Sequence, residues 1–326
     1  MATLNRDVWI VDVAPRDGLQ NDPAELSIPD KVELVRRLLN AGVYRVEVGS
    51  FVSPKWVPKM ADTDQVVRQI GHSDAEKCTC LVPNERGYDR ARLVGLKDVR
   101  TVVAASSTMN RKNFNCDIEE TLGEISHIAH RAQAEGVRLG VIIATAFGCP
   151  YEGYVPADRV LHLVEQLAGL GVQEIVLADT TGMAVPLQVA WLCEKALRAV
   201  DGFQVWLGIH LHNTRNAGYA NAFAAWQAGL TLFDASLGGI GGCPFAPRAT
   251  GNIATEDLVH MFERSGVKTG IDLEALVHTS NWLVEKLGHD VPSLLPKAGS
   301  VPQEAYKDGP FKGQAFNRGS PWAEML

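Results

Sequence analysis

The chain has 326 residues and a formal net charge of −7, with 31 Lys and Arg against 38 Asp and Glu. Hydrophobic residues make up 46% of it and charged residues 21%, a globular composition that excludes disordered and collagen-like chains. No dense run of Lys or Arg is present, so we expect neither a nucleic-acid partner nor binding to a membrane surface.

The cysteines and the N-terminal segment bear on the cellular compartment. The six cysteines are sparse and form no C-x-x-C pair, so neither a disulfide scaffold nor a structural zinc site is expected. The longest apolar stretch, near residues 137–148, is shorter than the roughly 20 residues of a membrane span. Residues 1–30 lack the apolar core of a secretory signal. We therefore expect a cytoplasmic protein with reduced thiols.

Short β-rich runs alternate with longer helical patterns along the chain. Strands are predicted over 8–13, 44–48, 77–82, 99–105, 138–146, 174–178, 205–211 and 232–237. Helices are predicted over 30–40, 62–70, 85–95, 118–135, 156–170, 186–200, 216–228 and 255–264. Near-continuous apolar strands are typical of a parallel sheet buried on both faces. Eight such units predict an α/β fold, the (β/α)8 TIM barrel.

The rival fold is a doubly wound open sheet. That fold usually has fewer strands and a glycine-rich phosphate turn after the first strand, which this chain lacks. Residues 290–326 hold five prolines and four glycines without a helical period. We therefore expect a barrel domain over 1–288 and an irregular Pro- and Gly-rich C-terminal tail over 289–326.

Polar residues gather where the predicted strands end, which is the catalytic face of a TIM barrel. His210 and His212 stand two apart in a predicted strand, so both imidazoles face one space. With Asp17 after the first strand and Asn252 after the eighth, two nitrogens and two oxygens could hold a divalent ion. Mg²⁺ or Mn²⁺ suits this set, with Zn²⁺ as a competitor. The alternative is a histidine pair satisfied by the backbone.

Three other residues at this face suggest catalysis. Arg16 could be a fixed cation that stabilises a developing enolate or alkoxide, or it could form only a loop salt bridge. Glu47 would be costly to bury unpaired, and Arg16 is its natural partner. Cys243 follows a run with four glycines in five residues. Such a loop can close over a substrate, where a thiol can exchange a proton with a carbon acid, although a surface thiol is the alternative.

The motifs around these residues resemble the 3-hydroxy-3-methylglutaryl-CoA (HMG-CoA) lyase family, part of a metal-dependent TIM-barrel lyase and Claisen-synthase superfamily. The resemblance covers about residues 8–285. The motifs are PRDGLQN at 15–21, SFVSPKWVPKMAD at 50–62, KNFNC at 112–116, GCPYEG at 148–153, DTTG at 179–182, GGCPFA at 241–246 and GNIATEDL at 251–258. The superfamily's synthases carry an arginine-containing GxGERxGN loop instead of GGCPFA, so the cysteine favours carbon–carbon cleavage.

This resemblance implies a retro-Claisen reaction that releases the enolate of acetyl-CoA. A divalent metal on the four ligands above would polarise the substrate hydroxyl. Arg16 would stabilise the enolate oxygen, Glu47 would orient Arg16, and Cys243 would protonate the enolate carbon. Asp179 would give polar support. The base stays open between a metal-linked water and a site carboxylate or histidine, with His210 counted among the catalytic residues.

The resemblance also indicates where the substrate binds. The expected substrate or CoA contacts are Gln20, Ser50, Arg111, Lys112, Asn113, Arg215 and Arg248. Residues 111–113 resemble the family's CoA-contacting stretch, where basic groups would meet phosphates. Arg215 stands where the lyases usually carry Tyr, and Arg248 where a small or amide side chain is usual. These two arginines could recognise another carboxylate.

The expected reaction is cleavage of HMG-CoA to acetyl-CoA and acetoacetate, a step of leucine degradation. The alternatives are citramalyl-CoA or a 3-hydroxy-3-alkylglutaryl-CoA as substrate, and a barrel that binds metal and acyl-CoA without turnover. We expect Mg²⁺ or Mn²⁺ and no organic cofactor. The family resemblance further implies a homodimer.

Overall fold

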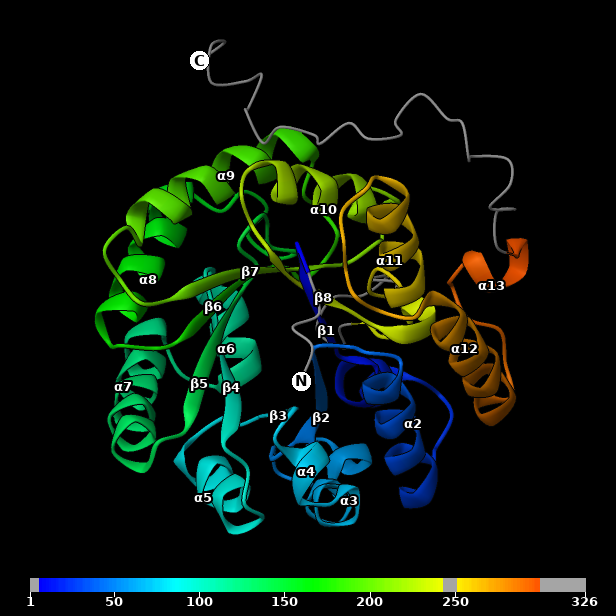
Figure 1. Ribbon diagram of the computed structural model, residues 1–326. Coiled ribbons are helices and arrows are strands. Elements are labelled where there is room, and N and C mark those ends of the chain that lie inside the picture. The colour runs from blue at the N-terminus through cyan, green and yellow to red at the C-terminus, as the bar shows by residue number, and fades with distance from the viewer. Residues whose placement is uncertain (1–5, 243–250, 300–326) are drawn as a thin grey trace.

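A computed structural model describes residues 6–242 and 251–299 of the chain. Eight parallel strands close into a barrel in sequence order, and helices surround it (Figure 1). The strands are β1 (Trp9–Asp12), β2 (Arg45–Ser50), β3 (Cys78–Leu81), β4 (Asp98–Ala104), β5 (Arg138–Ala144), β6 (Glu174–Asp179), β7 (Trp206–Leu211) and β8 (Leu232–Ala235). The expected TIM barrel is confirmed.

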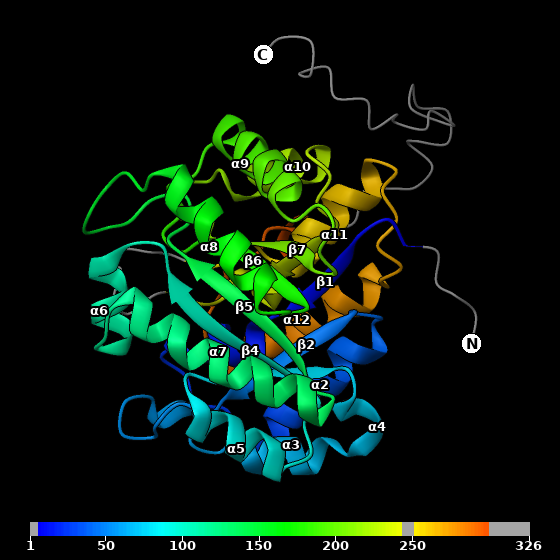
Figure 2. The same cartoon turned by 90° about the vertical axis from the view of Figure 1, so that its left-hand side faces the viewer.

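Each strand is followed by an outer helix that packs back on the barrel. These helices are α2 (Ile28–Asn40), α3 (Thr63–Ile70), α5 (Glu85–Leu93), α7 (Ile118–Glu135), α8 (Ala157–Gly169), α9 (Pro186–Ala199), α10 (Gly218–Gln227) and α11 (Thr255–Arg264). Additional elements are η1 (Ala14–Gly18), α1 (Leu19–Asn21), η2 (Pro58–Met60), α4 (His72–Ala75), α6 (Ser107–Phe114), η3 (Leu237–Gly239), α12 (Leu273–Leu287) and α13 (Leu295–Ala298). Figure 2 shows α7 and α8 outside β4 and β5.

Local sequence signals explain where the outer helices begin and end. At the start of α7 the Asp117 side chain accepts a hydrogen bond from the Glu120 N–H, and the Glu120 side chain accepts one from the Asp117 N–H. This reciprocal capping box satisfies two N–H groups that the helix cannot pair internally. The helix ends at Gly136 with φ of 64°, a left-handed conformation that glycine adopts without steric cost.

The main hydrophobic core lies between the barrel and its helices, and the barrel interior is filled differently. Two small apolar clusters line the interior, formed by Val11, Val13 and Leu232 and by Ile142, Val176 and Ala178. The remaining interior positions include buried charged residues, namely Arg45, Asp98, Arg100, Glu174 and Asp234. The interior of this barrel therefore combines apolar packing with ion pairs.

The chain beyond β8 adds helix α12, for which no helix was predicted from the sequence. Asp272 caps it by accepting a hydrogen bond from the Ala275 N–H, and it packs beside α2. The residues after α12 also pack on the barrel domain. Nε2 of His289 lies 2.9 Å from Oδ1 of Asp22, and Leu295 is buried. The division of the chain at residue 288 stays a prediction.

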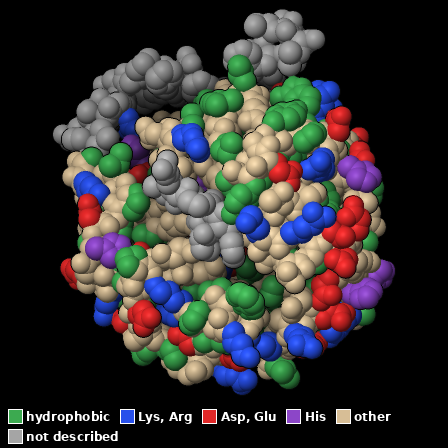
Figure 3. Space-filling model, turned by 180° about the vertical axis from the view of Figure 1, so that it is seen from behind, with side chains coloured by type: hydrophobic (Ala, Val, Ile, Leu, Met, Phe, Trp, Pro, Cys, Tyr) green, Lys and Arg blue, Asp and Glu red, His purple; other side chains and the backbone are tan. Residues whose placement is uncertain are grey.

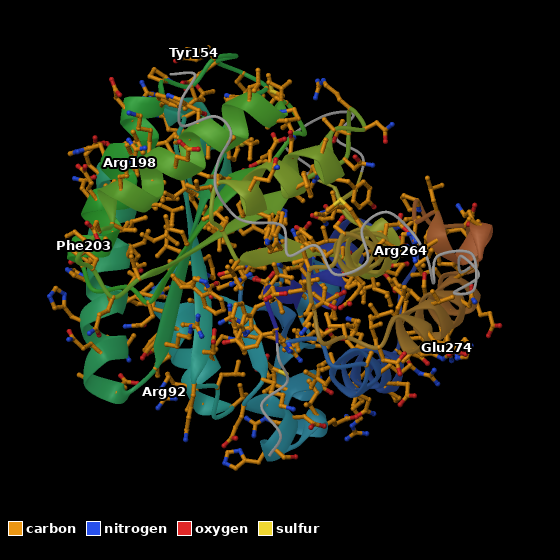
Figure 4. The ribbon with its side chains drawn as sticks, turned by 45° about the horizontal axis from the view of Figure 1, so that its top comes forward. Arg92, Tyr154, Arg198, Phe203, Arg264 and Glu274 are labelled. Carbon is orange, nitrogen blue, oxygen red and sulfur yellow. The ribbon has the colours of Figure 1, made fainter. Side chains whose placement is uncertain are left out.

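The helices form the outer surface of the molecule, and many of their polar side chains point to the outside. Arg92, Arg198 and Glu274, labelled in Figure 4, lie at the periphery of the molecule. Among the described residues, no helix combines the length and the apolar character needed to cross a membrane. The carboxyl ends of β4 and β5 lie at the left of Figure 2 and therefore on the face seen in Figure 3, which is hollowed near its centre.

Candidate active site

Asp17, His210 and His212 meet at the carboxyl end of the barrel. Asp17 lies on η1, a single π-helical turn directly after β1, and such turns occur often at functional sites. His210 lies on β7 and His212 just beyond it, with ring centroids 5.2 Å apart. All three are buried, and one ligand atom of each lies within 4.8 Å of the others. The cluster could therefore hold a metal ion.

Asn252 joins this cluster from the chain segment after β8. Its backbone bridges to His212, and its Nδ2 donates to Oδ2 of Asp17 at 2.8 Å and to the Ile240 carbonyl at 3.1 Å. Its Oδ1 is buried without a hydrogen-bond partner among the described residues. An unpaired buried acceptor costs about 1–3 kcal/mol, and a cation bound at the cluster would remove that cost. Two imidazoles, a carboxylate and an amide oxygen form a donor set that suits Mg²⁺ or Mn²⁺.

The glycine at position 241 is required by the packing around Asn252. Its φ is +125°, and a Cβ added there would lie 2.4 Å from Nδ2 of Asn252. Any side chain would therefore displace the amide from Asp17. The glycine-rich sequence before Cys243 thus has a local structural reason in addition to the catalytic one expected from the motif.

Arg16 lies between two carboxylates beside the cluster. Its Nε donates to Oε2 of Glu47 at 2.5 Å, and its Nη1 donates to Oδ1 of Asp17 at 2.7 Å. Burial lowers the pKa of Arg16, but Glu47 and Asp17 outweigh this and hold it above its usual value. The guanidinium is therefore a permanent positive charge whose direction is fixed by β2 and η1.

The carboxylate of Asp17 stays ionised although it is buried. Burial raises its pKa, whereas the neighbouring Arg16 guanidinium foremost, with His210, His212 and the Asn252 hydrogen bond, lowers it more, so the pKa lies below its usual value. An ionised carboxylate is the form that binds a metal ion. The electrostatics of the cluster therefore agree with metal binding.

The carboxylate of Asp234, in the barrel interior, orients the imidazole of His210. Its Nδ1 lies 3.3 Å from Oδ2 of Asp234 on β8, which leaves Nε2 for a metal ion. Arg100 on β4 donates to both oxygens of Asp234 at 3.0 Å. Neither Asp234 nor Arg100 was predicted as a site residue from the sequence. The available signal was a charged residue inside each of two strand runs that otherwise read as apolar.

Asp179 and Arg215 both hold the loop that follows β6. The Asp179 carboxylate accepts hydrogen bonds from the N–H groups of Met183 and Ala184, at 2.8 and 3.0 Å. Burial raises its pKa, which these hydrogen bonds only partly offset. Nη1 of Arg215 donates to the carbonyls of Thr181 and Gly182, at 2.8 and 3.0 Å. Each side chain thus has a positioning role in the structure.

The expected CoA contacts lie on α6 beside the loop after β5. Arg111 and Lys112 are exposed and Asn113 is half-buried. The Lys112 ammonium lies 4.8 Å from the ring centroid of Tyr151. The N-terminus of α6 meets the same loop, because the Thr108 N–H donates to Glu152 Oε1 at 2.6 Å. Two of the sequence motifs therefore form one surface.

Four further expected site residues remain, of which two lie among the described residues. Gln20 is half-buried on α1, next to the η1 turn. Ser50 is buried at the end of β2, where its Oγ accepts a hydrogen bond from the Val52 N–H at 3.2 Å. Cys243 and Arg248 lie outside the described residues.

A family model described as HMGL-like matches residues 7–283. The chain belongs to the HMGL-like family. It is 54% identical over 314 residues to the (R)-citramalyl-CoA lyase of Chloroflexus aurantiacus, covering 93% of this chain and 98% of that protein. It is 39% identical over 288 residues to a hydroxymethylglutaryl-CoA lyase of Bacillus subtilis, covering 88% and 96%.

The fold of the chain is also similar to that of a solved structure of this family. The HMG-CoA lyase of Acinetobacter baumannii, in complex with coenzyme A and 3-methylmalate, superposes with a TM-score of 0.86 at 40% identity. The match covers 93% of this chain and 100% of that one. The resemblance seen in the motifs is confirmed, and so is the assignment to the carbon–carbon lyases.

Proposed function

We propose that this lyase cleaves a 3-hydroxyacyl-CoA by a divalent-metal-dependent retro-Claisen reaction, with citramalyl-CoA as its preferred substrate. The observation that carries the proposal is the buried cluster of Asp17, His210 and His212 next to the Arg16 guanidinium. A metal-binding group and a fixed cation at one barrel mouth suit a reaction that forms an alkoxide and then an enolate.

Asp17, His210, His212 and Asn252 would hold the metal ion. Mg²⁺ or Mn²⁺ fits these nitrogen and oxygen donors, with Zn²⁺ as competitor. A divalent ion bound there would supply the positive charge that lowers the pKa of a substrate hydroxyl. No organic cofactor is needed for the bond cleavage, because the electron pair that leaves the broken bond is accepted by the thioester.

The chain's own side chains would handle the charge and the proton. The substrate hydroxyl gives up its proton to a base, the carbinol carbon becomes a ketone, and the carbon–carbon bond breaks towards the thioester. Arg16, held by Glu47, would stabilise the negative oxygen of the thioester enolate. Cys243 would return one proton to the enolate carbon. The products are acetyl-CoA and a keto acid, and no further reactant is consumed.

The choice between two substrates rests on one methylene. In HMG-CoA a CH₂ group separates the carbinol carbon from the carboxylate, whereas in citramalyl-CoA the two are joined directly. The 54% identity to a citramalyl-CoA lyase supports the shorter substrate, and the relatives named HMG-CoA lyases, at 39% for the Bacillus subtilis protein, keep HMG-CoA as the second candidate. One methylene is worth about 10- to 200-fold in discrimination.

We propose that Arg215 and Arg248 bind the substrate carboxylate. Arg215 uses Nη1 for the carbonyls of Thr181 and Gly182, and its Nε and Nη2 have no partner among the described residues. These donors are available to a carboxylate. For the CoA moiety we propose Arg111, Lys112 and Asn113 on α6, and we propose Gln20 on α1 and Ser50 at the end of β2 as further contacts of the substrate or CoA.

The oligomeric state and the cellular location of the protein are also proposed. We propose a homodimer and a cytoplasmic location, the latter supported by the cysteines of the described chain, all free thiols. A place in leucine degradation follows only if HMG-CoA is the substrate.

A substrate panel tests the proposal. The purified protein with Mn²⁺ is given (R)- and (S)-citramalyl-CoA, HMG-CoA and a longer 3-hydroxy-3-alkylglutaryl-CoA, and kcat/KM is measured for each. We expect one citramalyl-CoA enantiomer to exceed HMG-CoA by about 10- to 200-fold. An equal or higher value for HMG-CoA would move the preference to the second candidate. Metal binding without turnover of any of them would overturn the proposal in favour of a non-catalytic barrel.

A further inference from the structure

A column of buried ion pairs fills the barrel interior beneath the proposed metal site. Arg100 lies at its centre, with Nε donating to Oε1 of Glu174 at 2.8 Å and Nη1 donating to both oxygens of Asp234 at 3.0 Å. Arg45 pairs with Asp98 at 2.6 Å and with Glu174. At the start of β5 the half-buried Arg138 pairs with Glu174 and lies near Asp98. Three arginines thus face three carboxylates, and the column is electrically balanced.

The barrel is shaped to accept this column. Arg100 has no exposed surface, although it is among the largest side chains in the chain. On the neighbouring strand Gly140 makes room for it, since an added Cβ would lie 3.1 Å from Cγ of Arg100 and 3.2 Å from Oε1 of Glu174. A charged side chain in this place costs several kcal/mol of desolvation unless it is fully paired. Apolar side chains of similar volume would avoid that cost, so the column is poorly explained by stability alone.

The column ends at a proposed metal ligand. The register of β7 and β8 pairs His210 with Asp234, so the two side chains point to the same side of neighbouring strands. Oδ2 of Asp234 lies 3.3 Å from Nδ1 of His210. Arg100 holds both oxygens of Asp234 and so fixes the plane of that carboxylate. The plane of the carboxylate in turn sets the direction of the imidazole.

We propose that Asp234 and Arg100 are positioning residues for metal binding: Arg100 fixes Asp234, and Asp234 turns Nε2 of His210 towards Asp17. This inference rests on the metal site of the proposed function. Carboxylates that orient metal-binding histidines raise metal affinity about 10- to 100-fold. Without the column, the His210 ring would be free to leave the geometry that the cluster requires.

Direct Mn²⁺ binding separates this role from a merely structural one. Isothermal titration of Mn²⁺ and the electron paramagnetic resonance signal of Mn²⁺ are recorded for the wild type, Asp234→Asn, Arg100→Lys and Arg138→Gln. The last is the matched control, because Arg138 belongs to the column but bonds to Glu174 and not to Asp234. Circular dichroism melting shows which variants are folded.

We expect Mn²⁺ binding to weaken about 10- to 100-fold in Asp234→Asn, less in Arg100→Lys, and less than about twofold in Arg138→Gln. Asp234→Glu, which keeps a carboxylate, should restore part of the affinity and carries the test if Asp234→Asn does not fold. Wild-type affinity in both Asp234 variants would overturn the inference and leave the proposed function standing. A wild type that binds no Mn²⁺ would overturn the proposed metal site itself.

Discussion

Arg16 and Glu47 form a buried ion pair between the turn that follows β1 and strand β2, with 2.5 Å between Nε and Oε2. The pair fixes the guanidinium because β2 carries Glu47 and the η1 turn after β1 carries Arg16. The second donor, Nη1, reaches Asp17 at 2.7 Å. The guanidinium of Arg16 is therefore held at a fixed distance from Asp17, the proposed metal ligand, before any substrate arrives.

Replacing Arg16 with Lys should remove this fixed charge geometry. A lysine keeps the positive charge but cannot bond Glu47 and Asp17 through a planar fork. We expect Arg16→Lys to lower kcat about 100- to 1,000-fold with a smaller change in KM. Arg37→Lys is the matched control, because Arg37 on α2 pairs with Glu33 and lies over the Trp282 ring of α12, and it should leave both constants unchanged. A kcat within about threefold of the wild type would contradict the role given to Arg16.

Metal binding should stabilise the fold through Asp17. At a Mn²⁺ concentration of about 100 times Kd, the gain is about 2.7 kcal/mol, which raises Tm by several degrees. Asp17→Asn should abolish this shift, whereas Asp158→Asn, at an exposed position of α8, should keep it. Differential scanning calorimetry with and without Mn²⁺ measures the effect. An equal shift in Asp17→Asn and the wild type would place the metal elsewhere.

Asp12 should make stability fall as the pH rises. Burial raises its pKa from 3.8 to about 7, against hydrogen bonds from Thr255 and Ala14 that lower it. The folded chain therefore binds this proton more tightly than the unfolded chain does. The contribution is present below pH 3.8 and is lost as the pH rises towards about 7. The loss approaches about 1.4 kcal/mol per pH unit in the middle of that window.

Urea unfolding of Asp12→Asn against the wild type isolates this contribution. The asparagine cannot ionise, so the unfolding free energy of the variant relative to the wild type should increase as the pH rises from 5 to about 7. A difference that stays constant over this range would show that Asp12 titrates at the same pH in both states.

Gly241 should tolerate no side chain. The Cβ of Gly241→Ala would lie 2.4 Å from Nδ2 of Asn252, at a φ of +125°. We expect the variant to bind Mn²⁺ at least about tenfold more weakly, because the amide must move away from Asp17. Gly123→Ala, inside α7 with open space around it, is the control and should be neutral or stabilising by about 0.5–1 kcal/mol. Wild-type affinity in Gly241→Ala would contradict the packing argument.

The sequence was sufficient to predict the barrel because two periods repeat along it. Apolar strand runs and amphipathic helices alternate eight times. The carboxyl ends of the strands lie on one face, and Asp17, His210, His212 and Asn252 lie at or just beyond them. Once eight alternating units predict a TIM barrel, residues at the carboxyl ends of the strands are expected to lie close together. The roles of the individual residues are not decided by that count.

The buried column and helix α12 could not be found in the same way. Arg100 and Asp234 lie in runs that read as apolar on both faces, and only the register shows that their side chains face one interior. Pairing across 134 residues leaves no local signal. Helix α12 follows the eighth unit, where the repeating pattern gave no reason to expect another helix.

Mass-spectrometric detection of products from citramalyl-CoA tests the central claim most directly. Protein stripped of metal with EDTA is incubated with the substrate, before and after Mn²⁺ is restored. We expect acetyl-CoA and pyruvate in equal amounts only when Mn²⁺ is present, and neither product from Asp17→Asn. Equal cleavage without metal, or no cleavage of either citramalyl-CoA or HMG-CoA with Mn²⁺ bound, would contradict that claim.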